Sequence, residues 1–112
     1  MKLSIIIPVY NEENTINKVL EKIKDIDFEI EKEIIVVDDG STDTTRNILS
    51  RLQITNCKLH IIYHEKNQGK GAAIKTGIKN STGDIIAIQD ADLEYDPLEL
   101  KYLLKPIMDN KA

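Results

Sequence analysis

The sequence predicts an α/β domain, a Rossmann-like parallel sheet built from alternating β-α units. Short, continuous apolar runs alternate with segments in which apolar residues recur at helical spacing. Continuous apolar runs are typical of strands covered on both faces, as in a parallel sheet. Polar or acidic residues directly follow three of these runs. The alternation predicts right-handed crossovers and places the polar segments at the carboxyl edge of the sheet.

The length and composition indicate one small globular domain. The chain has 112 residues, of which 41% are hydrophobic and 30% charged, enough for one modest core. The formal net charge of −4 argues against a nucleic-acid partner. The only cysteine is Cys57, which excludes an internal disulfide and a cysteine-based metal site. No apolar run resembles a signal peptide or reaches the ~20 residues of a membrane span, so we expect a cytoplasmic chain.

The first half of the chain predicts two strands, at residues 3–7 and 33–37. Pro8 should end the first strand, because proline cannot donate a hydrogen bond to the ladder. Asn11 is expected to cap a helix over residues 13–24, which has apolar residues at helical spacing. A second helix follows the second strand, with apolar positions at Ile48, Leu49 and Leu52.

The second half predicts strands at residues 58–63 and 85–88. Between them, segment 67–73 contains two glycines, a lysine and two alanines before a helix. It indicates either a helix start that approaches an anion closely or a helix packed tightly on the sheet. Its spacing matches neither a P-loop nor a dinucleotide fingerprint, so both interpretations stay open. The last helix should begin near Pro97, and Pro106 should kink or shorten its end.

An acidic segment follows the fourth predicted strand, with Asp90, Asp92 and Glu94 at every second position. If the chain stays extended there, the three carboxylates point to one side. Carboxylates at such short separations repel each other, and a bound cation would offset this repulsion. Carboxylate oxygens suit Mg²⁺ or Mn²⁺, which proteins usually hold with one or two carboxylates and substrate phosphates. A solvated acidic turn is the alternative interpretation.

Three polar segments, residues 8–12, 38–41 and 90–92, should meet at the carboxyl edge of the sheet. Ligands of open parallel sheets bind outside this edge. Tyr10 offers a ring for stacking on a base, and Asp39 offers a carboxylate to a base or ribose. The acidic segment offers metal ligands for a diphosphate. Together the segments predict a nucleotide site.

Four motifs resemble the donor half of family-2 glycosyltransferases with the GT-A fold: IIIPVYNEE, IIVVDDGSTD, NQGKGAAIKTG and GDIIAIQDADLEYDP. The resemblance covers residues 3–104 and is greatest to the polyprenyl-phosphate (dolichyl-phosphate) mannosyl- and glucosyltransferases. It implies that residues 1–112 form the nucleotide-sugar-binding domain of such an enzyme. Because these enzymes continue into an acceptor-binding half, we expect the domain to be incomplete at its C-terminus.

The resemblance also implies residue roles. Asp90, Asp92 and Glu94 would bind Mg²⁺ or Mn²⁺, and the first two would act in catalysis through the metal. Glu94 departs from a glutamine that some relatives carry at this position. Asp38 is expected to have a turn or capping role outside the site. The nucleotide pocket would be lined by Pro8, Tyr10, Glu12, Val37, Asp39 and Ala91.

The implied reaction is transfer of a hexose from a nucleotide sugar of the GDP-mannose or UDP-glucose type. The implied acceptor is a polyprenyl phosphate, which would place the protein at the periphery of a membrane. A lipid phosphate is already ionised near neutral pH, since its second pKa is ~6, so such an acceptor needs no general base. The resemblance names neither the sugar nor a general base.

Three other functions agree with parts of the pattern. A metal-nucleotide-binding fragment without turnover would lack only the acceptor site, and we expect this chain alone to bind donor without transferring sugar. A nicotinamide-binding domain needs a glycine-rich first turn, whereas residues 8–12 read PVYNE. A receiver-like Mg²⁺-binding signalling domain needs an acidic pair after its first strand and a fifth strand. The predicted elements provide neither.

Overall fold

The computed structural model describes residues 1–54 and 57–110 and confirms the predicted β-α alternation. The β-α elements follow one another in strict order along the chain. They are β1 (Lys2–Val9), α1 (Ile16–Asp25), β2 (Glu31–Asp38), α2 (Thr45–Ser50), β3 (Lys58–Tyr63), α3 (Lys70–Lys79), β4 (Ile85–Ile88) and α4 (Leu98–Asn110).

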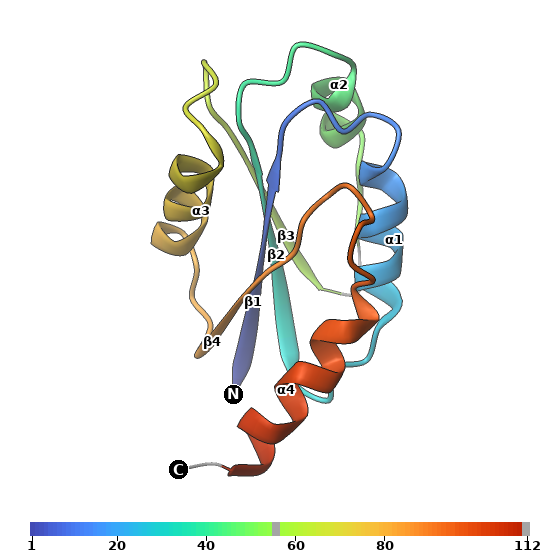
Figure 1. Cartoon of the computed structure of the whole chain (residues 1–112), viewed down its shortest axis with the longest axis vertical. Helices are drawn as coiled ribbons and strands as arrows, with labels where there is room; N and C mark the ends of the chain where they lie inside the picture. The colour runs from blue at the N-terminus through green and yellow to red at the C-terminus, as the bar shows by residue number, and fades with distance from the viewer. Residues whose placement is uncertain (55–56, 111–112) are drawn as a thin grey trace.

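The described strands form one parallel sheet in the order β3-β2-β1-β4. β1 pairs with β2 along its whole length, and with β4 only as far as Ile6, which lies opposite Ile88. Because β2 and β3 lie on one side of β1 and β4 on the other, the strand order reverses between β1 and β4. Figure 1 shows the result, with α1 and α2 on one face of the sheet and α3 on the opposite face. Sheets of this kind bind ligands at such a reversal, beyond the carboxyl ends of the strands.

Alternate residues of the central strands enter two different cores. The larger core lies on the α1 side of the sheet, and α4 joins it through Leu104. The smaller core lies under α3 and contains Ile6, Ile35, Val37 and Ala73. Strands buried on both faces explain why the sequence shows continuous apolar runs instead of alternation. The larger core contains Leu3, Ile5, Ile7 and Val9 of β1 and Ile16, Val19, Leu20 and Ile23 of α1.

Gly77 lets α3 lie close to the sheet. A Cβ atom at position 77 would lie 2.5 Å from Cγ2 of Ile6, which is closer than two carbon atoms can approach. A Cβ atom at Gly71, near the start of the same helix, would have open space around it. The tight-packing interpretation therefore applies to α3 from Ala73 to Gly77, whereas Gly71 at its start leaves room for another role.

The expectation that Pro8 ends the first strand was wrong. β1 continues to Val9, and Pro8 lies opposite Val37. The backbone carbonyl of Ile6 accepts a hydrogen bond from Gln89 N at 2.9 Å, on the β4 side of β1. Pro8, two residues further on, faces the same side, where β4 has already ended. Its missing N–H therefore removes no bond from the ladder.

Pro106 does not shorten α4, which continues to Asn110 with one intrahelical hydrogen bond fewer in an exposed part of the helix. The start of α1 differs from expectation. α1 begins at Ile16 with Thr15 at its N-cap position, because Asn11 bonds to another loop instead. No helix within residues 1–54 and 57–110 combines the length and apolar character needed to cross a bilayer.

Candidate functional site

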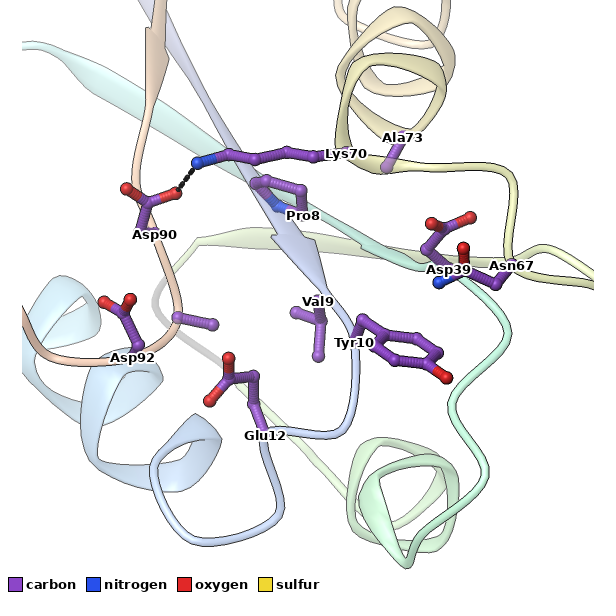
Figure 2. Close-up of a pocket in the computed structure, with 11 residues that line it drawn as sticks. Pro8, Val9, Tyr10, Glu12, Asp39, Asn67, Lys70, Ala73, Asp90 and Asp92 are labelled. Atoms are coloured by element: carbon purple, nitrogen blue, oxygen red, sulfur yellow. Dashed lines mark hydrogen bonds and ion pairs between the residues drawn. The ribbon is translucent and has the colours of Figure 1, made fainter.

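A pocket of about 320 Å³ lies beyond the carboxyl ends of the strands, where the strand order reverses. Figure 2 shows Tyr10, Asp39 and Asn67 on one side of it and Asp90 and Asp92 on the opposite side. The pocket therefore joins a half with an aromatic ring to an acidic half. Its lining comes from four segments: Pro8, Val9, Tyr10 and Glu12; Asp39; Asn67, Lys70 and Ala73; Asp90, Ala91 and Asp92.

Most of the residues that the sequence singled out lie in this pocket. Val37 and Glu94 do not. Val37 is fully buried in the smaller core because its side chain points into the α3 layer. Glu94 is exposed outside the lining. Asp38, expected outside the site, is likewise absent from the lining. The residues brought together as expected are Pro8, Tyr10, Glu12, Asp39, Asp90, Ala91 and Asp92.

The acidic segment is a turn, so the extended geometry expected for its three carboxylates was wrong. β4 ends at Ile88, and Leu93 has a φ of +65°, which reverses the chain locally. The Asp92 carboxylate accepts a hydrogen bond from Glu94 N at 3.0 Å. As a result, the described residues contain no group of three or more His, Cys, Asp or Glu side chains arranged to hold a metal.

Two residues that the sequence analysis passed over hold this turn in place. The buried Gln89 donates from Nε2 to the backbone carbonyls of Asp90, at 3.2 Å, and Tyr95, at 3.0 Å. Thr15 Oγ1 donates to the Ala91 carbonyl at 2.5 Å. These bonds fix the backbone on both sides of Asp90 and Asp92. Both contacts depend on the turn geometry, which the residue pattern did not reveal.

Lys70 supplies a positive charge to the acidic half of the pocket. Its Nζ lies 2.5 Å from Oδ1 of Asp90, a contact that Figure 2 marks with a dashed line. The hydrogen bond to Asp90, together with the fields of Asp90, Asp92 and Glu94, raises the pKa of Lys70 despite the opposing effect of burial. The ammonium group is therefore charged at neutral pH.

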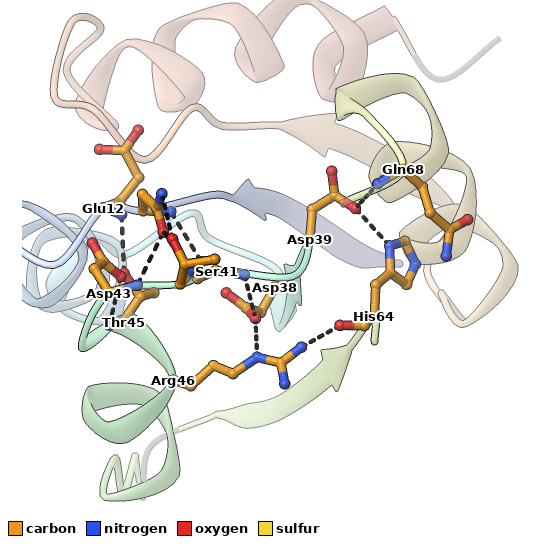
Figure 3. A network of polar contacts seen from close by, with 11 residues as sticks. Glu12, Asp38, Asp39, Ser41, Asp43, Thr45, Arg46, His64 and Gln68 are labelled. Atoms are coloured by element: carbon orange, nitrogen blue, oxygen red, sulfur yellow. Dashed lines mark hydrogen bonds and ion pairs between the residues drawn. The ribbon is translucent and has the colours of Figure 1, made fainter. Parts of the chain in front are cut away.

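Asp39 is nearly fully buried and accepts three hydrogen bonds, of which those from His64 and Gln68 are drawn in Figure 3. Oδ1 accepts from His64 Nδ1 at 2.8 Å and from Gln68 N at 2.9 Å, and Oδ2 accepts from Gly69 N at 2.8 Å. Burial alone would raise the pKa of Asp39, but the bonds from His64 and the two amides lower it below its usual value. An ionised carboxylate has about four acceptor positions, so one stays available beside these three bonds.

The neighbouring Asp38 fixes the loop that follows β2. Its fully buried Oδ2 accepts from Arg46 Nε at 2.7 Å and from Ser41 N at 3.3 Å. Arg46 Nη2 also donates to the carbonyl of His64, which continues the network of Figure 3 toward Asp39. This agrees with the turn role expected for Asp38.

Asn11 joins the loop after β1 to the loop after β2. Its Oδ1 accepts from Thr42 N at 2.8 Å and from Asp43 N at 3.2 Å, and its backbone N donates to Ser41 Oγ at 2.9 Å. Its φ of +52° is one that asparagine tolerates better than most residues. The clamp positions Tyr10, directly before it, against the pocket.

The acidic half of the pocket fits a divalent cation. Asp90 and Asp92 both line it, and carboxylate oxygens are the ligands that Mg²⁺ and Mn²⁺ prefer. Two carboxylates are enough where substrate phosphates complete the coordination. Glu94, exposed outside the lining, is not placed to join them.

Comparison with known proteins identifies the family. Residues 4–112 match the sequence model of glycosyl transferase family 2. An undecaprenyl-phosphate 4-deoxy-4-formamido-L-arabinose transferase from Proteus mirabilis is 38% identical over 106 residues, covering 92% of this chain and 32% of the relative. A dolichol-phosphate mannosyltransferase from Pyrococcus furiosus is 33% identical over 107 residues, covering 96% of this chain and 30% of the relative. The chain thus spans about a third of the length of these relatives.

A solved structure gives the same answer for the fold. The mannosyltransferase of Pyrobaculum calidifontis, in complex with GDP-Man and Mn²⁺, matches with a TM-score of 0.71 and 32% identity. The match covers 80% of this chain and 27% of that chain. The fold and the family inferred from the four motifs are therefore confirmed. The chain belongs to glycosyl transferase family 2.

Proposed function

We propose that this chain is the donor-binding part of a glycosyltransferase that transfers a hexose from a nucleoside diphosphate sugar to a polyprenyl phosphate. The observation that carries the proposal is the pocket itself. It places Tyr10 and Asp39 on one side and Asp90 and Asp92 on the other, around a space of about 320 Å³. A nucleoside would bind in the half with Tyr10 and Asp39. A diphosphate and its cation would bind in the half with Asp90 and Asp92.

In the nucleoside half, the half-exposed ring of Tyr10 stacks on the base. The remaining acceptor position of Asp39 takes a hydrogen bond from the base or the ribose. Asp39 needs no rearrangement to do so, because His64, Gln68 and Gly69 already fix its carboxylate. The site is thus preorganised, which lowers the cost of ordering side chains on binding.

In the acidic half, Asp90 and Asp92 would hold Mg²⁺ or Mn²⁺. The bound cation would neutralise charge that develops on the departing nucleoside diphosphate. Gln89 and Thr15 keep the backbone of the acidic turn fixed, and Lys70 adds a positive charge to the lining of this half.

The proposed polyprenyl-phosphate acceptor is supported by the relatives, whose names refer to undecaprenyl phosphate and dolichol phosphate. A phosphate oxygen that is already ionised attacks the sugar without a general base. Such an acceptor would also place the enzyme at a membrane surface.

Calorimetry with GDP, UDP and ADP, each with Mn²⁺, with Mg²⁺ or with EDTA, tests the proposal. We expect GDP or UDP to bind only with metal, and Asp92→Asn to weaken this binding without lowering the melting temperature of the metal-free protein. Equal binding in EDTA would exclude the metal role, and no binding by folded protein would exclude the pocket. Transfer of radiolabelled sugar from GDP-mannose or UDP-glucose to a polyprenyl phosphate then tests the acceptor.

A further inference from the structure

The ammonium group of Lys70 occupies one of the two carboxylates that would bind a divalent cation. Nζ lies 2.5 Å from Oδ1 of Asp90, and Asp92 and Glu94 strengthen the field at the ammonium. The Lys70 side chain is 60% exposed and that of Asp90 is 27% exposed, so ions in solution reach this contact. Without metal, the lysine is therefore the cation of the acidic half.

The ammonium and a metal ion cannot share the same oxygen at these distances. A Mg²⁺–oxygen bond is about 2.1 Å long, so the metal would lie within about 4.6 Å of an ammonium 2.5 Å from that oxygen. Two cations this close repel each other. Metal binding to Asp90 therefore weakens the Lys70 contact and favours its displacement.

Lys70 has the freedom to move, while its backbone stays fixed. It is the first residue of α3, and the preceding Gly69 is fixed by the bond from its N–H to Asp39 at 2.8 Å. The long side chain lines the same pocket as Asp39 and Asp92. When it leaves Asp90, with Asp92 taken up by the metal, a bound diphosphate offers the ammonium a new negative partner.

We propose that Lys70 is a resident counter-ion, which the divalent cation displaces from Asp90 and thereby releases toward the diphosphate. This inference rests on the proposed function and adds a coupling to it. The metal alone binds weakly, because it has to displace the lysine. The metal and the nucleotide strengthen each other's binding, because the released ammonium gains a new partner in the diphosphate, and this coupling acts equally in both directions.

The test compares wild-type protein with Lys70→Met and with Lys75→Met, a control exposed on the same helix outside the pocket lining. Mn²⁺ binding is measured by electron paramagnetic resonance, with and without GDP or UDP. Without nucleotide, Lys70→Met should bind Mn²⁺ about fivefold more tightly, the effect of removing one nearby like charge at a water-exposed site. Lys75→Met should change binding less than twofold. The factor by which nucleotide tightens Mn²⁺ binding should be smaller in Lys70→Met than in wild type.

A second readout follows Lys70 directly in the wild-type protein. The side-chain ¹⁵Nζ signal of Lys70 should move to the position of exposed lysines when Mg²⁺ saturates the site, and that of Lys75 should stay unchanged. Displacement is excluded if Lys70→Met binds Mn²⁺ no more tightly than wild type, if neither protein binds it, or if the Lys70 signal stays in place while Mg²⁺ binds. Wild-type nucleotide binding separates the two hypotheses: if it is normal, only this inference fails, and if it is absent, the proposed function fails too.

Discussion

Nδ1 of His64 donates a hydrogen bond to the carboxylate of Asp39 at 2.8 Å, and both side chains are buried beneath the pocket. On its other side, Nε2 of His64 lies 2.8 Å from Oγ1 of Thr76 on α3. Asp39 also accepts from the amides of Gln68 and Gly69. The residue that faces the nucleoside half of the pocket therefore also ties the end of β2 to the start of α3.

Asp39→Ala should reduce both nucleotide affinity and stability, each by about 1–3 kcal/mol. The substitution leaves the donor of the buried His64 and the part-buried amides of Gln68 and Gly69 without their acceptor. Calorimetry and urea unfolding measure the two effects. Glu65→Gln, at an exposed position next to His64, is the control and should change each by less than about 0.5 kcal/mol. Unchanged stability in Asp39→Ala would show that the hydrogen bonds to Asp39 contribute little to the free energy of unfolding.

Asn11→Ala should weaken nucleotide binding more than it destabilises the fold. Asn11 holds the loop of Tyr10 against Thr42 and Asp43 through bonds from their backbone amides to its Oδ1. Without this clamp, nucleotide binding must order the loop, at a cost on the order of 1 kcal/mol. Asn11→Asp keeps the acceptor oxygen and should recover most of the affinity, as measured by calorimetry. If Asn11→Asp binds nucleotide as weakly as Asn11→Ala, the hydrogen bonds to Asn11 Oδ1 do not position the loop.

Gly77→Ala should destabilise the protein by about 1–3 kcal/mol, because the new methyl group overlaps Cγ2 of Ile6. Gly71→Ala is the matched control on the same helix. It meets no atom within 4 Å and should be neutral or stabilise by up to about 1 kcal/mol. Urea unfolding of both variants tests the prediction. Equal stabilities would mean that α3 does not lie as close to the sheet as the structure shows.

Stability should also fall in acid because of Glu33, at the amino edge of the sheet. Its Oε2 accepts hydrogen bonds from Ser4 Oγ at 2.6 Å and from Thr82 N at 2.7 Å. Burial would raise the pKa of Glu33, but these bonds and the charge of Lys2 lower it from 4.5 to about 2. A carboxyl with a lowered pKa stabilises the folded state above its unfolded pKa, and this contribution disappears as protons bind.

The contribution of Glu33 is therefore expected in full above pH 4.5 and should disappear as the pH falls toward about 2. One pKa unit corresponds to about 1.4 kcal/mol, so the loss is at most about 3.5 kcal/mol. Urea unfolding of wild type and Glu33→Gln between pH 6 and pH 2 measures it. The variant should be less stable at pH 6 and should show a flatter acid profile. Parallel profiles would assign the acid sensitivity to other groups.

The sequence predicted the sheet, its layers and the position of the pocket because these depend on local patterns. Apolar runs and helical spacing fix the elements, and parallel strands bring their carboxyl ends to one edge. It could not predict the contacts that join distant segments. Asn11 lies about 30 residues from its partners, His64 lies 25 from Asp39, and Lys70 lies 20 from Asp90. A sequence pattern does not show which side chains contact each other when they are so far apart along the chain.

The two candidate residues outside the pocket show the same limit. Glu94 was expected beside Asp90 because an extended chain repeats every two residues, but the positive φ of Leu93 turns the chain before Glu94. Val37 was placed at the nucleotide by resemblance, whereas in β2 its side chain belongs to the α3 layer. In both cases the local backbone geometry determined whether the side chain lies in the pocket.

We propose above all that a divalent cation binds at the carboxyl edge of the sheet, at Asp90 and Asp92. Paramagnetic broadening of backbone amide signals by Mn²⁺, in the presence of GDP or UDP, tests it most directly. The account predicts that the amides of residues 9–12, 69–70 and 90–92 broaden first and that EDTA restores them. Amides at the opposite edge of the sheet, such as those of Glu33 and Thr82, should stay sharp. Broadening centred elsewhere, or spread evenly over the chain, would contradict the account.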